Sequence, residues 1–78
     1  MTNELPKILI VDDEEYIVDL LLEFLDNDDR TLFGTTCTEA AIDYLEQEQP
    51  HAAIVDLKMP QLDGIALVKK GKEISPNT

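Results

Sequence analysis

Two short apolar runs, each ending at an aspartate, constrain the fold of this 78-residue chain more than any other feature. Ile8–Val11 precedes Asp12, and Ala52–Val55 precedes Asp56. Neither run alternates apolar with polar residues, so each predicts a strand covered on both faces, as in parallel sheets. Parallel strands need crossover connections, which are usually helices. The pattern therefore predicts an α/β fold.

The rest of the chain alternates in the same way. We expect strands over residues 7–12, 31–36 and 51–57, and helices over residues 13–25, 38–48 and 63–74. Gly34 interrupts the middle strand, which suits a short strand at the edge of a sheet. Since no linker, repeat or low-complexity segment divides the chain, we expect one small domain.

The first two predicted helices carry apolar residues at helical spacing. In the first helix, four residues stand at i, i+3, i+4 and i+7, namely Ile17, Leu20, Leu21 and Phe24. This spacing predicts that they form the face that packs on the sheet. In the second helix the corresponding stripe is Ala41, Ile42 and Leu45. Thr36 and Glu39 have the spacing of a capping box at its start.

The third predicted helix contains a glycine, Gly71, four residues after Leu67. An apolar side chain at this position would continue the buried stripe. A glycine inside a helix costs about 1 kcal/mol against alanine. We therefore expect the end of this helix to be weak or bent.

The chain is strongly acidic, with a net charge of −11. This charge argues against direct binding to nucleic acids, which needs cationic surface, and against anionic membranes. Residues 1–50 hold 14 acidic and two basic side chains, whereas residues 51–78 hold three acidic and four basic ones. Three of the four basic residues are Lys69, Lys70 and Lys72. These lysines could form either a solvated face or a docking patch.

Cysteine and histidine usage excludes some classes of protein. A single cysteine, Cys37, rules out an internal disulfide, and a single histidine leaves no zinc-type cluster. A lone thiol fits a reducing compartment. No apolar run approaches the roughly 20 residues of a spanning helix, and the N-terminus lacks the features of a signal peptide. We therefore expect a cytoplasmic protein without a membrane segment.

Acidic side chains stand where two of the predicted strands end. Asp12 and Asp13 follow the first strand, and Asp56 follows the third. If those strands are neighbours, three carboxylates meet at the carboxyl edge of the sheet, where open α/β folds bind ligands. Clustered carboxylates favour a hard divalent cation such as Mg²⁺, and a carboxylate can also accept a phosphoryl group. The simpler alternative is that Asp12 and Asp13 only cap a helix or a turn.

The segments around these acids resemble a known family. Ile8–Glu14 and Ile54–Gly64, with Met-Pro and Asp-Gly pairs after Asp56, resemble the receiver domain of two-component response regulators. The resemblance implies a flavodoxin-like three-layer fold with strand order 2-1-3 in this part of the sheet. It also implies Mg²⁺-dependent phosphorylation on an aspartate within a phosphorelay.

The resemblance assigns a role to each matching residue. Asp56 corresponds to the phospho-accepting aspartate and, with Asp12 and Asp13, to the ligands of Mg²⁺ or Mn²⁺. The backbone carbonyl of Lys58 corresponds to a further metal ligand. Other positions shape the adjacent loop or cap the following helix, namely Met59, Pro60, Asp63 and Gly64. The implied partner is a sensor histidine kinase or a phosphotransfer protein.

The resemblance covers the first three of the family's five βα units. We therefore expect no counterparts of the later Ser or Thr, Lys and aromatic switch residues. The strand over residues 51–57 would then be an exposed sheet edge, which is a template for pairing with another chain. The alternative function is thus a truncated receiver that acts as a non-switching binding or dimerisation module, with a homodimer formed through this strand.

Overall fold

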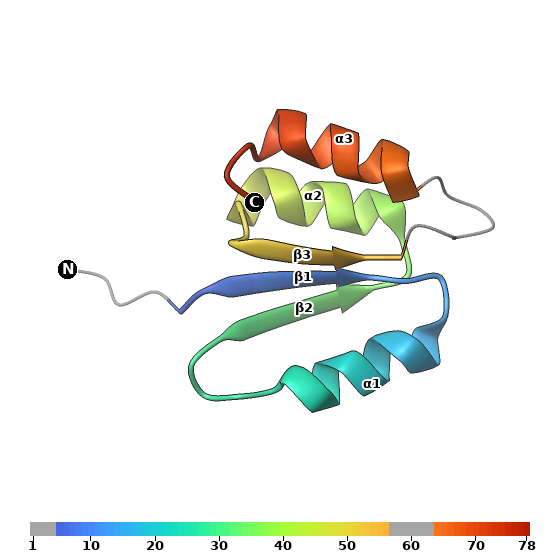
Figure 1. The fold of residues 1–78 in the computed structure, drawn as a ribbon, viewed down its shortest axis with the longest axis vertical. Helices are drawn as coiled ribbons and strands as arrows, with labels where there is room; N and C mark the ends of the chain where they lie inside the picture. Colours follow the sequence, from blue (N-terminus) through green and yellow to red (C-terminus); the bar gives the residue numbers. More distant parts are fainter. Residues whose placement is uncertain (1–4, 57–63) are drawn as a thin grey trace.

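The computed structural model describes residues 5–56 and 64–78 of the chain (Figure 1). Within these residues, strands and helices alternate in the order β1 (Lys7–Val11), α1 (Glu15–Leu25), β2 (Thr31–Thr35), α2 (Thr38–Glu48), β3 (Ala52–Val55) and α3 (Gly64–Ile74). The strands are parallel and lie in the order β2-β1-β3. The predicted fold class and strand order are confirmed. No helix in the described ranges has the length and hydrophobicity needed to cross a bilayer.

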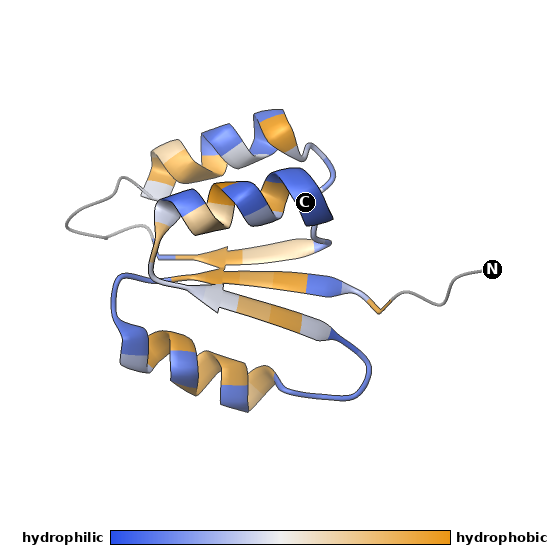
Figure 2. Ribbon diagram, turned by 180° about the vertical axis from the view of Figure 1, so that it is seen from behind, coloured by the Kyte–Doolittle hydropathy of each residue, from blue (hydrophilic) through white to orange (hydrophobic). Residues whose placement is uncertain are grey.

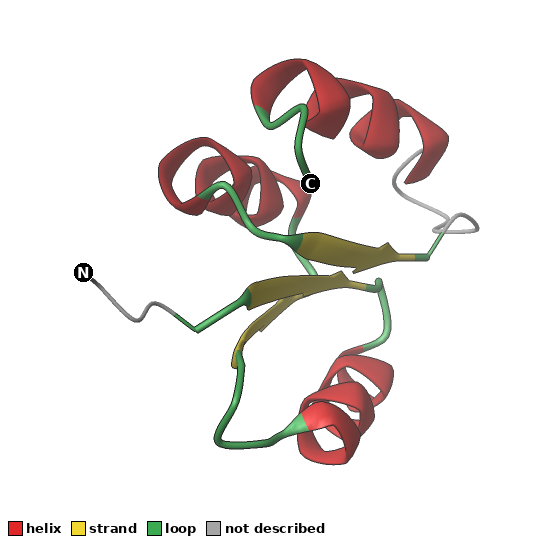
Figure 3. Cartoon of the chain, turned by 60° about the vertical axis from the view of Figure 1, so that its left-hand side comes forward, coloured by secondary structure: helices red, strands yellow, loops and turns green. Residues whose placement is uncertain are grey.

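The sheet lies between two helical layers, with α1 on one face and both α2 and α3 on the other (Figures 1 and 3). β1 is the central strand, and its residues Leu9, Ile10 and Val11 are almost completely buried. Figure 2 shows that β1 is hydrophobic along much of its length, between the helical layers. Leu9 and Val11 pack with Leu45 of α2 and Leu67 of α3 in the main core cluster. Burial on both faces accounts for the unbroken apolar run of β1.

Several helices and strands begin or end one or two residues away from the predicted positions. α1 begins at Glu15 rather than at residue 13, because the backbone turns first: the Glu14 N–H donates to the Asp12 carboxylate at 2.9 Å. β1 and β2 each end one residue earlier than predicted, at Val11 and Thr35. β3 occupies 52–55 rather than 51–57, and residues 57 and 63 lie outside the described part of the chain.

The capping box expected at Thr36 and Glu39 is wrong. The residue at the N-cap of α2 is Cys37, and its side chain makes no capping hydrogen bond. Instead, the Cys37 N–H donates to the Thr35 hydroxyl at 3.0 Å. The hydroxyl that orders this strand-to-helix junction therefore stands at the end of β2.

α1 packs on the sheet through a face that only partly matches the predicted one: Ile17 and Leu21 are half-buried. Val18 is buried, and Val18 and Leu22 reach over Gly34 of β2. Leu20 and Phe24, which were expected to cover the sheet, are exposed. A Cβ atom on Gly34 would lie 2.5 Å from Val18 Cγ1 and 3.0 Å from Leu22 Cδ1. The missing side chain of Gly34 thus makes room for this face of α1.

A second glycine, Gly71, allows a close approach between α3 and α2. α3 runs without a break from Gly64 to Ile74, and Gly71 is buried within it. A Cβ atom on Gly71 would lie 3.3 Å from Leu45 Cδ1 of α2. The Gln49 side chain ties the ends of the two helices together by donating to the Leu45 and Ile74 carbonyls, both at 3.1 Å. Gly71 therefore does not interrupt α3, and the expected weakness or bend at the end of this helix stays a prediction.

Candidate functional site

Asp12, Asp13 and Asp56 lie together at the carboxyl edge of the sheet. The Asp12 N–H donates to the Thr35 carbonyl of β2 at 3.3 Å, and the Asp56 N–H donates to the Val11 carbonyl of β1 at 3.0 Å. These bonds extend the strand pairing by one residue and place the two backbones relative to each other. One carboxylate oxygen from each of the three acids lies within 4.8 Å of the others. The structure thus brings together the three acids that the sequence placed at strand ends.

The three carboxylates line an open hollow of about 460 Å³. Part of its wall is apolar and is formed by Ile17 and Leu21 of α1 and Ile54 of β3. This apolar wall was not predicted. Ile17 and Leu21 have the spacing of core residues, and helical spacing does not separate a core side chain from one at the rim of a site.

Electrostatics at the site favour a bound cation. The pKa of Asp13 is raised above its ordinary value, first by the loss of surrounding water and then by the hydrogen bond and negative charge of Asp12. The charge of Asp56 acts in the same direction. A raised pKa means that the ionised carboxylate is disfavoured in these surroundings. Three half-buried carboxylates at this spacing suit a hard divalent ion, which would stabilise their ionised forms.

Four predicted site residues lie outside the described part of the chain, namely Lys58, Met59, Pro60 and Asp63. The metal-ligand role of the Lys58 carbonyl and the loop and capping roles of the other three stay predictions. Gly64 is described, and it is the buried first residue of α3.

The fold and the site define a small parallel α/β domain with an acidic pocket, and comparisons with known proteins identify its family. Residues 8–78 match the family model of the response regulator receiver domain. Sporulation initiation phosphotransferase F of Bacillus subtilis (strain 168) is 38% identical over 77 residues, and response regulator GtcR of Aneurinibacillus migulanus is 40% identical over 63 residues. The chain belongs to the response regulator receiver domain family.

A solved structure supports the same fold. A signal receiver domain from Vibrio parahaemolyticus aligns with a TM-score of 0.78 and 23% identity, covering 92% of this chain and 57% of that one. The alignment with sporulation initiation phosphotransferase F covers 99% of this chain and 60% of that protein. The alignment with GtcR covers 81% of this chain and 26% of that protein. The chain therefore spans three-fifths or less of the length of these proteins.

Proposed function

We propose that this chain is the phospho-accepting module of a two-component phosphorelay, with Asp56 as the acceptor. One observation carries the proposal: carboxylate oxygens of Asp12, Asp13 and Asp56 converge within 4.8 Å at the edge where α/β sheets bind ligands. Membership of the receiver family supports it, and one relative is named as a phosphotransferase.

The proposed reaction transfers a phosphoryl group to a carboxylate oxygen of Asp56. The new bond joins that oxygen to phosphorus, while the bond between phosphorus and the donor breaks and the donor keeps its electron pair. The proposed donor is a phosphohistidine on a sensor histidine kinase or a phosphotransfer protein. Asp56 suits the acceptor role because it is only half-buried and its backbone N–H is held by the central strand.

Asp12, Asp13 and Asp56 are the proposed ligands of one Mg²⁺ or Mn²⁺, together with the Lys58 carbonyl. A bound ion would offset the charges of these carboxylates and of the transferred phosphoryl oxygens. The Glu14 N–H holds one oxygen of Asp12 and so orients that carboxylate. A bound cation would also offset the charges of Asp12 and Asp56 that help to raise the pKa of Asp13.

Intact-mass measurement after incubation with Mg²⁺ and acetyl phosphate tests this function. We expect a gain of about 80 Da, the mass of a phosphoryl group on the nucleophilic carboxylate. The gain should disappear in Asp56→Ala and in samples treated with a chelator. Asp43→Asn, which alters an exposed acid on α2, is the matched control and should keep the adduct. An unmodified wild-type chain, or an adduct that persists in Asp56→Ala, contradicts the proposal.

A second candidate function is a binding or dimerisation module that does not switch. The exposure of Ala52, Ala53 and Ile54 favours it, because these residues form a strand at the edge of the described sheet. Mg²⁺ binding without any adduct on Asp56 would support this second candidate. We also propose a cytoplasmic location, which the free Cys37 thiol supports, because free thiols persist in reducing compartments.

A further inference from the structure

One peptide group at the end of β1 is hydrogen-bonded to both neighbouring strands beside the acidic site. This group joins the carbonyl of Val11 to the N–H of Asp12. Its N–H donates to the Thr35 carbonyl of β2 at 3.3 Å, and its carbonyl accepts the N–H of Asp56 at 3.0 Å. Because a peptide group is planar and rigid, these two hydrogen bonds turn together. The Thr35 carbonyl is therefore linked to the backbone of Asp12 directly and to that of Asp56 through one peptide group.

The direction of the Thr35 carbonyl is fixed by the hydroxyl of the same residue. Thr35 is the last residue of β2, and the chain leaves the sheet there to enter α2 (Figure 1). The Cys37 N–H donates to the Thr35 hydroxyl at 3.0 Å. This bond closes a ring that contains the Thr35 carbonyl carbon, as in the turns that serine and threonine form with their own backbone. The ring restricts rotation of the carbonyl and keeps it directed toward β1.

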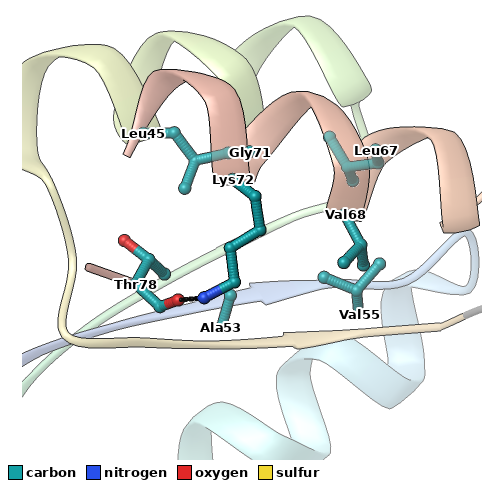
Figure 4. Close-up of a pocket in the computed structure, with 8 residues that line it drawn as sticks. All are labelled: Leu45, Ala53, Val55, Leu67, Val68, Gly71, Lys72 and Thr78. Atoms are coloured by element: carbon teal, nitrogen blue, oxygen red, sulfur yellow. Dashed lines mark hydrogen bonds between the residues drawn. The ribbon is translucent and has the colours of Figure 1, made fainter. Parts of the chain in front are cut away.

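The contacts beside the end of β3 on the α3 side are apolar. Val55, the residue before Asp56, lines a hollow of about 300 Å³ between β3 and α3 and points toward Val68 across it (Figure 4). The two polar residues in its wall, Lys72 and Thr78, are hydrogen-bonded to each other toward the start of β3. Apolar contacts have no preferred direction, whereas the hydrogen bond from the Asp56 N–H to β1 has one.

We propose that Thr35 is a positioning residue of the acidic site, and that its hydroxyl sets the placement of Asp12 and Asp56 through this peptide group. The role rests on the proposed function, because both acids are proposed ligands of the metal ion. Carboxylate oxygens of the three acids lie within 4.8 Å of one another, and metal ligands must be held within about 0.5 Å of their working geometry. Without the hydroxyl, the Thr35 carbonyl turns with the junction and both backbones lose alignment.

A Mg²⁺ titration of the full chain, followed by NMR of the backbone amides, tests the proposal. Thr35→Val keeps a branched, strand-favouring side chain but removes the acceptor. We expect its dissociation constant for Mg²⁺ to rise about tenfold, the lower end of the effect of removing a group that orients metal ligands. Thr35→Ser keeps the hydroxyl and should restore most of the affinity. Thr31→Val is the matched control at the other, exposed end of β2, and it should bind Mg²⁺ as the wild type does.

Amide hydrogen exchange of the metal-free chain separates this role from a general loss of stability. In Thr35→Val, the N–H groups of Asp12 and Asp56 should both exchange faster than in the wild type. Exchange at Leu9, in the buried middle of β1, should stay unchanged, because that part of the strand does not depend on the Thr35 carbonyl. Thr35→Ala removes the same hydroxyl with different packing and should behave as Thr35→Val does.

The possible outcomes are distinct. The proposal is overturned if Thr35→Val and Thr35→Ala bind Mg²⁺ as the wild type does, or if exchange at Asp56 is unchanged in them. It is also overturned if Thr31→Val weakens binding equally or if Thr35→Ser fails to restore it. A wild-type chain that binds no Mg²⁺ contradicts the proposed metal site, and exchange at Asp56, measured without metal, then decides the role of Thr35 alone.

Discussion

Substitution of Gly34 by alanine should destabilise the fold, because α1 occupies the space that the new side chain needs. The added Cβ would lie 2.5 Å from Val18 Cγ1 and 3.0 Å from Leu22 Cδ1. Real Cβ contacts essentially never fall below 3.0 Å, so one of these groups must move. Leu22 can change its rotamer, but Val18 is β-branched and has one strongly preferred χ1 angle in a helix. We therefore expect α1 to shift away from β2.

The size of the effect follows from the overpacking that this shift relieves. Extra methyl groups in a packed core typically cost about 1–3 kcal/mol. Alanine recovers about 0.5–1 kcal/mol through the lower backbone entropy of the unfolded chain. We expect a net loss of about 1–2 kcal/mol in the free energy of unfolding, at the middle of these ranges. For a domain of this size, 1 kcal/mol corresponds to a fall in Tm of about 4–8 °C.

Urea denaturation followed by circular dichroism measures this loss directly. The double variant Gly34→Ala/Val18→Ala supplies the mechanistic control, because removal of the Val18 methyl groups relieves the clash. Its free energy of unfolding should exceed the additive expectation by about 1 kcal/mol, as expected for residues in contact. A Gly34→Ala chain as stable as the wild type, or a strictly additive double variant, would refute the close approach of α1 to β2.

Other substitutions should behave as follows. Gly71→Ala should change stability by less than about 1 kcal/mol, because the gain in helix propensity opposes a contact of 3.3 Å with Leu45, and urea titration measures it. Asp13→Asn should stabilise the metal-free protein at neutral pH. Because the pKa of Asp13 is raised in the folded protein, the free energy of unfolding of the wild type falls as pH rises past the ordinary pKa of aspartate. The stability gained by Asp13→Asn should therefore vanish in acid, where Asp13 is protonated in both states. Mg²⁺ at ten times its Kd should raise the free energy of unfolding by about 1.4 kcal/mol, and Asp56→Asn should reduce this effect in the same titration. Phe24→Ser should change stability by less than about 0.5 kcal/mol, since Phe24 is 81% exposed, and a larger thermal shift would contradict the observed orientation of α1.

Much of the fold could be predicted because its signals are local. The apolar run of β1 is long enough to require burial on both faces, and the structure buries Leu9, Ile10 and Val11. The stripe of α2 is confirmed by burial of Ala41 and Leu45. The face of α1 could not be predicted, because Leu20 and Leu22 are equally apolar and only contact with the sheet distinguishes them. Helical spacing gives the width of an apolar face but does not say which part of it meets a neighbour.

The candidate site divides in the same way. Asp12, Asp13 and Asp56 could be placed at strand ends from the sequence, since each acid follows a run of strand residues. Their convergence within 4.8 Å needed the strand order β2-β1-β3, which sets β1 beside β3. The apolar wall of the pocket, which includes Ile17 and Ile54, depends on the path of α1 across the sheet.

The alternation of strands and helices and the receiver motif can be predicted from the sequence alone, because side-chain periodicity and strand-end acids are patterns of a few neighbouring residues. Which helix faces meet the sheet, and how closely α3 approaches α2, could be seen only in the folded chain. These features depend on residues far apart in the chain, such as Val18 with Gly34 and Leu45 with Gly71. Whether a glycine weakens an element or admits a neighbour is set by the atoms that pack against it, and those atoms come from other elements.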